Sequence, residues 1–143
     1  MNEYIKIRLN SRDLHEGFEF KLNVQDNYVR TVKPKYKMVQ VRSHFFSRIH
    51  FDVLNNYGHT LFQLHEMGLN SGHYQVNGDG FTQYEVTISK NAVDIFYPES
   101  DTTVSFTMEK SFDLDPKGQK LLVAALFECL LADVLHSDKL ASA

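Results

Sequence analysis

The sequence is poor in cysteine, tryptophan, proline and glycine, and each scarcity limits what the protein can be. Its 143 residues include one cysteine, Cys129, no tryptophan, three prolines and seven glycines. One cysteine excludes an intramolecular disulfide and any metal site built on several thiolates, and it favours a reducing, intracellular compartment. With 43% hydrophobic residues the chain is not of the disordered class, and its length suits one domain, residues 1–143.

Signals that direct a chain into or across a membrane are also missing. The N-terminus has no basic flank followed by an apolar run, so the sequence predicts no secretory signal. No window contains the roughly 18 consecutive apolar residues of a membrane span. We therefore expect a cytoplasmic protein, with any membrane contact being peripheral.

One segment lacks acidic residues altogether. Between Asn27 and Phe51 there is no Asp or Glu, but there are six basic residues: Arg30, Lys33, Lys35, Lys37, Arg42 and Arg48. From Val53 onward, twelve acidic residues outnumber five basic ones, while the whole chain carries a net charge of −3. A basic segment on an acidic background makes the molecule a dipole, which orients near charged surfaces.

Most of the chain shows apolar residues alternating with polar ones, the pattern of half-buried strands. The pattern predicts about ten strands, among them 4–9, 18–24, 27–32, 36–42, 48–53, 59–66, 84–88, 93–97 and 102–108. A four-residue loop at 55–58 would pair Val53 with Thr60 and Phe51 with Phe62. A two-residue turn at 90–91 would pair Val86 with Ile95, and residues 102–108 would add a third strand in register.

The pattern changes near the C-terminus, where a helix is predicted. Asp115 is suited to the N-cap and Pro116 to the first helical position. Residues 121–127 are all apolar and cover every direction around the helix, so this part should be buried on all sides. The helix is expected to end near Ser137, leaving a frayed tail.

These elements predict a mostly β fold with one C-terminal helix. A helix that is apolar all round can fill a closed sheet, so we expect an antiparallel β-barrel wrapped around a central hydrophobic helix. The alternative is a helix-grip fold, in which the helix lies across an open, curved sheet and leaves a cavity for a small hydrophobic ligand. That helix would be amphipathic along its full length.

Two segments carry a resemblance to a known family. Residues 112–120, Phe-Asp-Leu-Asp-Pro-Lys-Gly-Gln-Lys, run into a hydrophobic helix that ends with Asp133 and His136. This segment resembles the end of the tubby C-terminal-like superfamily, which includes phospholipid scramblases, plant LURP-one-related proteins and small bacterial homologues. Residues 52–62 also look similar to the strand-turn-strand repeat of that group. The resemblance implies a strand barrel around a central hydrophobic helix.

The resemblance also implies a functional direction. Tubby domains bind phosphoinositides, so the basic segment is expected to meet an anionic lipid or a phosphoinositide at a membrane surface. The candidate lipid-binding residues are Arg30, Lys33, Lys35, Lys37, Arg42 and Arg48. In an extended backbone Lys33, Lys35 and Lys37 would point to one side. The same lysines would alternatively protect an edge strand from pairing with another sheet.

Structural roles are the favoured interpretation for the other residues that could bind metal or act as nucleophiles. His50 and Asp52 share one face of a strand, with His59 and His65 across the hairpin, but a solvated polar face is the favoured interpretation over a metal site. Asp113 and Asp115 lack the six to eight or so oxygen ligands of calcium, and Cys129 is expected to be a buried core residue.

No phosphate-binding loop, nucleophile elbow or paired-carboxylate motif is present, so neither an enzyme nor a cofactor is predicted. Nucleic acid is not an expected partner, because the chain is acidic and offers no stacking platforms.

Overall fold

The structure, a computed structural model, describes residues 4–33, 37–43, 46–78, 81–108 and 114–130. In these residues ten strands precede one helix. The strands are β1 (Ile5–Ser11), β2 (Glu16–Asn23), β3 (Tyr28–Lys33), β4 (Met38–Ser43), β5 (His50–Asn55), β6 (Thr60–Glu66), β7 (His73–Gly78), β8 (Phe81–Ile88), β9 (Ala92–Tyr97) and β10 (Thr102–Met108). The helix is α1 (Pro116–Leu130).

The strands form a closed antiparallel barrel. Each strand pairs with its neighbours in the chain, and β1 closes the barrel by pairing with β10 through Leu9 opposite Met108. Closure leaves no open sheet, so the helix-grip alternative is wrong. The predicted mostly β fold with a closed barrel and one C-terminal helix is confirmed.

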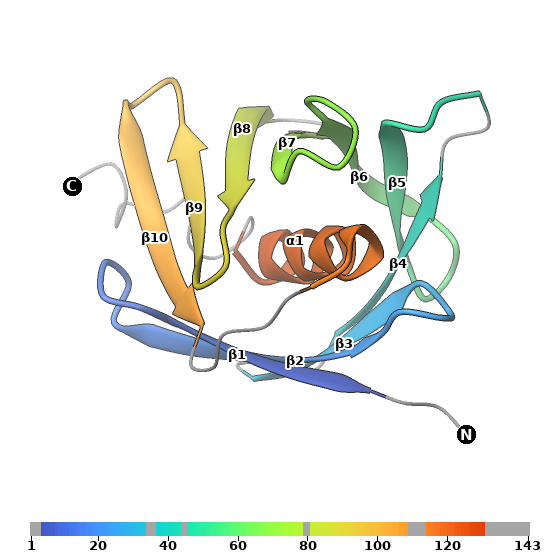
Figure 1. Ribbon diagram of the computed structural model, residues 1–143, viewed down its shortest axis with the longest axis horizontal. Helices are drawn as coiled ribbons and strands as arrows, with labels where there is room; N and C mark the ends of the chain where they lie inside the picture. Colours follow the sequence, from blue (N-terminus) through green and yellow to red (C-terminus); the bar gives the residue numbers. More distant parts are fainter. Residues whose placement is uncertain (1–3, 34–36, 44–45, 79–80, 109–113, 131–143) are drawn as a thin grey trace.

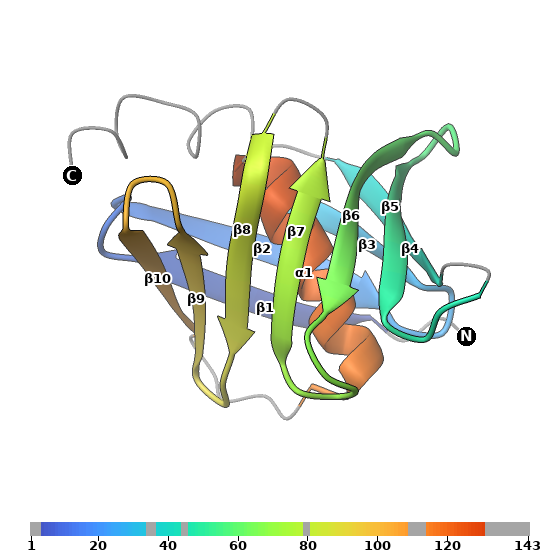
Figure 2. The same cartoon turned by 90° about the horizontal axis from the view of Figure 1, so that it is seen from above.

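Helix α1 runs through the interior of the barrel (Figures 1 and 2). Residues 121–127 are each at most 1% exposed, as their unbroken apolar run predicts. The inward residues of the strands complete this core, including Phe18, Phe20 and Phe106. Cys129 is also buried, at 7% exposed, in agreement with its predicted role in the core.

The helix begins as predicted. The Asp115 carboxylate accepts a hydrogen bond from the Gly118 backbone N–H at 2.8 Å, the geometry of an N-cap, and Pro116 is the first helical residue. Asp115 thus has a structural role. Asp113 and the predicted helix end near Ser137 lie outside the described residues.

The register of the last three strands is confirmed. Val86 lies opposite Ile95, and Ile95 lies opposite Val104. The short turn fixes this register, because the Ser89 N–H donates a hydrogen bond to the Ala92 carbonyl across residues 90–91 at 2.9 Å.

The predicted register of the β5–β6 hairpin is wrong by two residues. Phe62 lies opposite Val53 rather than opposite Phe51, and Thr60 lies opposite Leu54. One residue of this shift comes from a shorter loop, since the Asn55 N–H bonds to the His59 carbonyl and leaves only residues 56–58 in the loop. The other comes from a bulge in β6, where Leu61 has no partner between Thr60 opposite Leu54 and Phe62 opposite Val53. Leu54 is buried, at 2% exposed.

Candidate functional site

Of the six predicted basic residues, the five that the structure describes do not lie in one patch. Lys33 is exposed on the outer face of β3 opposite Glu19, and Arg42 is exposed on β4 opposite Asp52. Arg30 lies half-buried on β3 opposite Lys21. Lys35 lies outside the described residues.

Lys37 points in a different direction from Lys33. Its ammonium lies 3.4 Å from the Glu128 carboxylate and donates a hydrogen bond to the Glu128 backbone carbonyl at 3.3 Å. This contact ties the β3–β4 connection to the last turns of α1. Lys37 therefore stabilises the helix end inside the barrel, where its charge is already compensated.

The outer face around Lys33 is also partly neutralised. Arg8 donates a hydrogen bond to the Glu19 carboxylate at 3.0 Å, and this bond, together with the nearby charge of Lys33, lowers the pKa of Glu19. Glu19 is consequently ionised at neutral pH and reduces the positive potential at this part of the surface.

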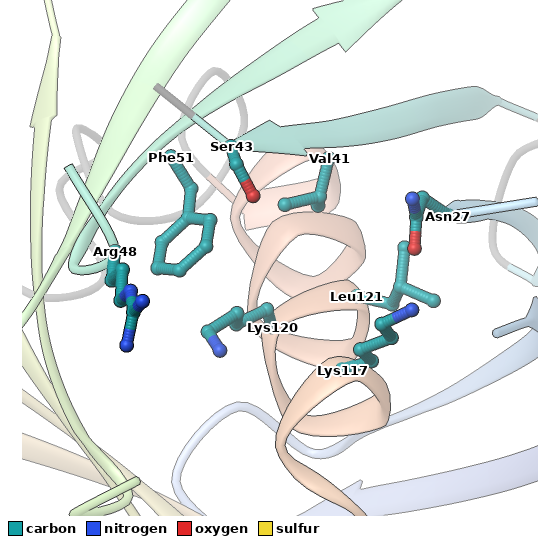
Figure 3. Close-up of a pocket in the computed structure, with 8 residues that line it drawn as sticks. All are labelled: Asn27, Val41, Ser43, Arg48, Phe51, Lys117, Lys120 and Leu121. Atoms are coloured by element: carbon teal, nitrogen blue, oxygen red, sulfur yellow. The ribbon is translucent and has the colours of Figure 1, made fainter. Parts of the chain in front are cut away.

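Arg48, the last of the six, lines a pocket at the end of the barrel where α1 begins (Figure 3). The pocket has a volume of about 330 Å³. Its walls come from the β2–β3 turn, from β4 and β5, from the segment before β5 and from the first turns of the helix. The lining residues are Asn27, Val41, Ser43, Arg48, Phe51, Lys117, Lys120 and Leu121.

Three of these eight lining residues are basic. Lys117 and Lys120 lie three positions apart on α1. Figure 3 shows the Lys120 side chain extending toward Arg48 and the Lys117 side chain extending toward Asn27. The two lysines were missed because candidate basic residues were taken only from the segment 27–51, and the helix was considered mainly for its apolar run at 121–127. Their spacing at the start of the helix, ahead of the apolar run, is the signal that would have found them.

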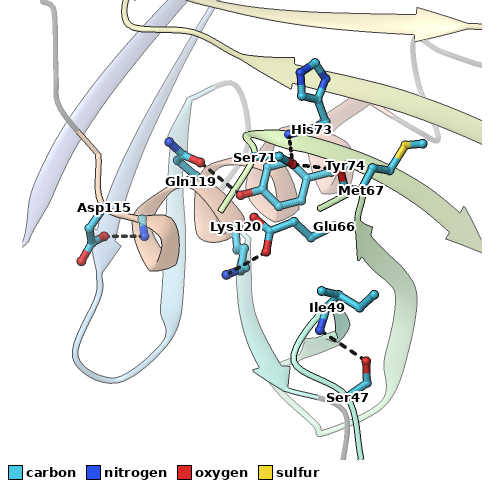
Figure 4. Close-up of polar contacts among 11 residues, drawn as sticks. Ser47, Ile49, Glu66, Met67, Ser71, His73, Tyr74, Asp115, Gln119 and Lys120 are labelled. Atoms are coloured by element: carbon cyan, nitrogen blue, oxygen red, sulfur yellow. Dashed lines mark hydrogen bonds and ion pairs between the residues drawn. The ribbon is translucent and has the colours of Figure 1, made fainter. Parts of the chain in front are cut away.

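Lys120 is the most buried of the three cations. Its side chain is 12% exposed, and its ammonium lies 3.7 Å from the carboxylate of the fully buried Glu66 (Figure 4). The same ammonium lies 4.4 Å from the centre of the Phe51 ring. Neither carboxylate oxygen of Glu66 accepts a hydrogen bond from the described residues. Lys120 is therefore the counter-charge that makes burial of this carboxylate tolerable.

A second contact fixes the rotation of the helix beside Lys120. The Tyr74 hydroxyl donates a hydrogen bond to the Gln119 side-chain carbonyl at 3.1 Å (Figure 4). Burial and the neighbouring Glu66 carboxylate raise the pKa of Tyr74, so the phenol keeps its proton at neutral pH. With Gln119 held by β7 and Lys120 held by β6, the helix keeps its lysines turned toward the pocket.

The other two cations of the pocket have no ionic partner within the described part of the chain. Arg48 and Lys117 are both exposed, and neither has an ion pair with any residue that the structure describes. Asn27 and Ser43 add neutral polar groups, while Val41, Phe51 and Leu121 give an apolar wall. Such a pocket is suited to an anionic group attached to an apolar body.

Exposed apolar side chains surround this end of the barrel. Phe46 precedes β5 and is 91% exposed, while Met67 and Leu69 follow β6 and are 46% and 62% exposed. The two loops lie side by side, because the Glu66 N–H donates a hydrogen bond to the Ile49 carbonyl at 2.8 Å. Basic and apolar side chains thus occur together at one end of the molecule.

Comparisons of this chain with protein-family models, with curated proteins and with solved structures found no match. Among the residues that the structure describes, α1 is too short and no other helix is present that could cross a bilayer. The same residues contain no cluster of three or more histidine, cysteine or acidic side chains placed to hold a metal ion.

Proposed function

We propose that this chain is a non-enzymatic tubby-like domain that binds anionic lipid, of the phosphoinositide type, at the cytoplasmic surface of a membrane. The observation that carries the proposal is the pocket beside the start of α1, whose lining includes Arg48, Lys117 and Lys120. The resemblance of residues 112–137 to the tubby C-terminal-like superfamily supports the same ligand class. The candidate site thus moves from the basic segment as a whole to this pocket, with Arg48 common to both.

The surroundings of the pocket favour a membrane lipid over a free anion as its ligand. Phe46, Met67 and Leu69 would enter the interfacial region of a bilayer while the cations meet a phosphorylated head group. Exposed apolar side chains next to a basic site are costly for a protein that binds only soluble anions. The hydrophobic-ligand carrier is not favoured, because α1 occupies the interior that such a ligand would need.

The proposal is tested by neutralising the two uncompensated cations. Each basic residue near an anionic surface contributes about 1 kcal/mol, so the pair Arg48→Gln and Lys117→Gln should weaken binding by roughly thirtyfold. The measurement is sedimentation with phosphatidylcholine vesicles that either contain or lack a phosphoinositide. Added salt should weaken binding in parallel, because the Debye length falls from about 10 Å at 0.1 M to about 3 Å at 1 M.

The matched control is the pair Lys33→Gln and Arg42→Gln, which removes the same charge from the outer face of the barrel. We expect this control to bind phosphoinositide vesicles as the wild-type protein does. Loss of binding in the control pair alone would return the site to the basic segment 30–48. If the wild-type protein does not bind anionic vesicles at low salt, the lipid proposal itself is contradicted.

A further inference from the structure

A pair of histidines on the outer face of the barrel has a geometry that the pocket does not explain. His50 on β5 and His65 on β6 are directly opposite each other in the ladder. Their Nδ1 atoms lie 3.0 Å apart, and their ring centres lie 4.3 Å apart with the planes tilted by 49°. One ring nitrogen therefore faces the other at hydrogen-bond distance, on a surface open to solvent.

We propose that His50 and His65 form a binding site for a divalent transition-metal ion, with Nδ1 of each ring as a ligand. Imidazole nitrogens bind such ions at about 2.0–2.1 Å. Two bonds of this length, at an angle between a right angle and the tetrahedral angle, place the nitrogens about 2.9–3.4 Å apart. The observed separation of 3.0 Å lies within this range, so an ion enters with little movement of either backbone.

The proton balance of binding is simple. In the free protein one ring donates its Nδ1 proton to the Nδ1 lone pair of the other ring. Binding requires both Nδ1 lone pairs, so the donor ring changes tautomer: its proton leaves Nδ1 and a proton is taken up at Nε2 from solvent. The tautomer change involves no net gain or loss of protons, no oxidant or reductant takes part, and one hydrogen bond is exchanged for two metal bonds.

The surrounding surface leaves room for further ligands. A hollow of about 190 Å³ is lined by His50, Phe51, Asp52 and Gln63. The Asp52 Oδ1 atom accepts a hydrogen bond from the Gln63 amide at 3.1 Å, which orients a carboxylate on the same face two residues from His50. Arg42 lies opposite Asp52 on β4 and offsets part of its charge. The protein thus supplies two nitrogen ligands at a surface open to solvent, from which water would complete the coordination.

The backbone holds this pair rigidly. The inward neighbours Phe51 and Leu64 also lie opposite each other, and they are 7% and 0% exposed, so the buried core fixes the register that brings the rings together. A pre-organised pair loses little conformational freedom on binding. Two imidazoles with water favour Cu²⁺ over Ni²⁺ and Zn²⁺, in accordance with the Irving–Williams order.

The test is titration of the purified full chain with Cu²⁺, followed by calorimetry and by electron paramagnetic resonance. We expect one ion per chain and nitrogen hyperfine structure from two imidazoles. His50→Asn and His65→Asn should each weaken Cu²⁺ binding at least about tenfold. The double variant should bind Cu²⁺ no more weakly than either single variant, because a chelate fails when one ligand is lost.

His73→Asn is the matched control. His73 is also an exposed histidine on a neighbouring strand, but its Nδ1 lies 3.2 Å from the Thr87 hydroxyl and not beside another imidazole. Its variant should bind Cu²⁺ as the wild-type protein does, and thermal melting should show all variants folded. Binding that survives both His50→Asn and His65→Asn, or that falls equally in His73→Asn, would overturn the proposal.

Discussion

Replacement of Leu126 by aspartate is expected to abolish folding. Leu126 is fully buried in α1, and the helix is enclosed by the barrel, so the new carboxylate would have neither water nor a cation beside it. An unpaired buried charge costs several kcal/mol, and the lost leucine packing adds about 2–5 kcal/mol. Together these terms are comparable to the whole stability of a domain of this size, which is about 5–15 kcal/mol. Circular dichroism and thermal melting measure the outcome.

Leu69→Asp is the control for this change. It makes the same chemical replacement at a residue that is 62% exposed in the β6–β7 loop, so its melting temperature should stay close to that of the wild-type protein. A folded Leu126→Asp variant with wild-type melting would indicate that the helix lies on the surface, and it would contradict our conclusion that the barrel encloses α1.

Replacement of Lys120 by methionine is expected to destabilise the protein strongly. Methionine keeps the length and most of the packing of the lysine side chain, but it leaves the fully buried Glu66 carboxylate without a cation. Breaking a buried pair in this way costs about 3–5 kcal/mol. For a chain of this length, that corresponds to a fall in melting temperature on the order of 10 °C.

Two further variants separate the ion pair from the loss of a lysine. Lys117→Met removes an exposed lysine from the same helix face and should change stability by only about 0.5 kcal/mol or less. The double variant Glu66→Gln with Lys120→Met removes both charges and should recover most of the lost stability. Equal melting of Lys120→Met and wild-type protein would show that no ionised Glu66 depends on this lysine.

The sequence predicted best where local chemistry and periodicity agree. The β8–β9–β10 register was correct because short turns at residues 90–91 and 98–101 restrict how three alternating strands can align. The start of α1 was correct because the Asp115 cap and Pro116 act locally. The barrel itself followed from an apolar helix that only a closed sheet can enclose.

The β5–β6 register shows where periodicity stops being informative. A shift of two residues leaves every side chain on the same face, so the alternating pattern scores both registers equally. The shorter loop depends on Gly58, whose φ of 81° lies in the left-handed region, and the second residue of the shift comes from the bulge at Leu61 in β6. Neither the loop nor the bulge changes the polar and apolar pattern enough to be recognised beforehand.

The pocket could not be assembled from the sequence, because its walls are distant along the chain. Asn27, Arg48 and Lys117 come from three separate parts of the sequence, and only closure of the barrel brings them to one end. The contiguous basic segment was the visible signal, but strand geometry distributes its residues between the outer face, the helix end and the pocket. Lys37 illustrates this, since its partner Glu128 lies 91 residues away.

Mapping of a soluble head group by amide NMR shifts tests the proposed site most directly. Inositol trisphosphate, the head group of a phosphoinositide, would be added to isotope-labelled wild-type protein. We expect saturable shifts at Asn27, Ser43, Arg48 and residues 117–121, and we expect these shifts to be lost in the double variant Arg48→Gln with Lys117→Gln. Shifts confined to the outer face of β3 around Lys33, or no saturable shifts at all, would contradict it.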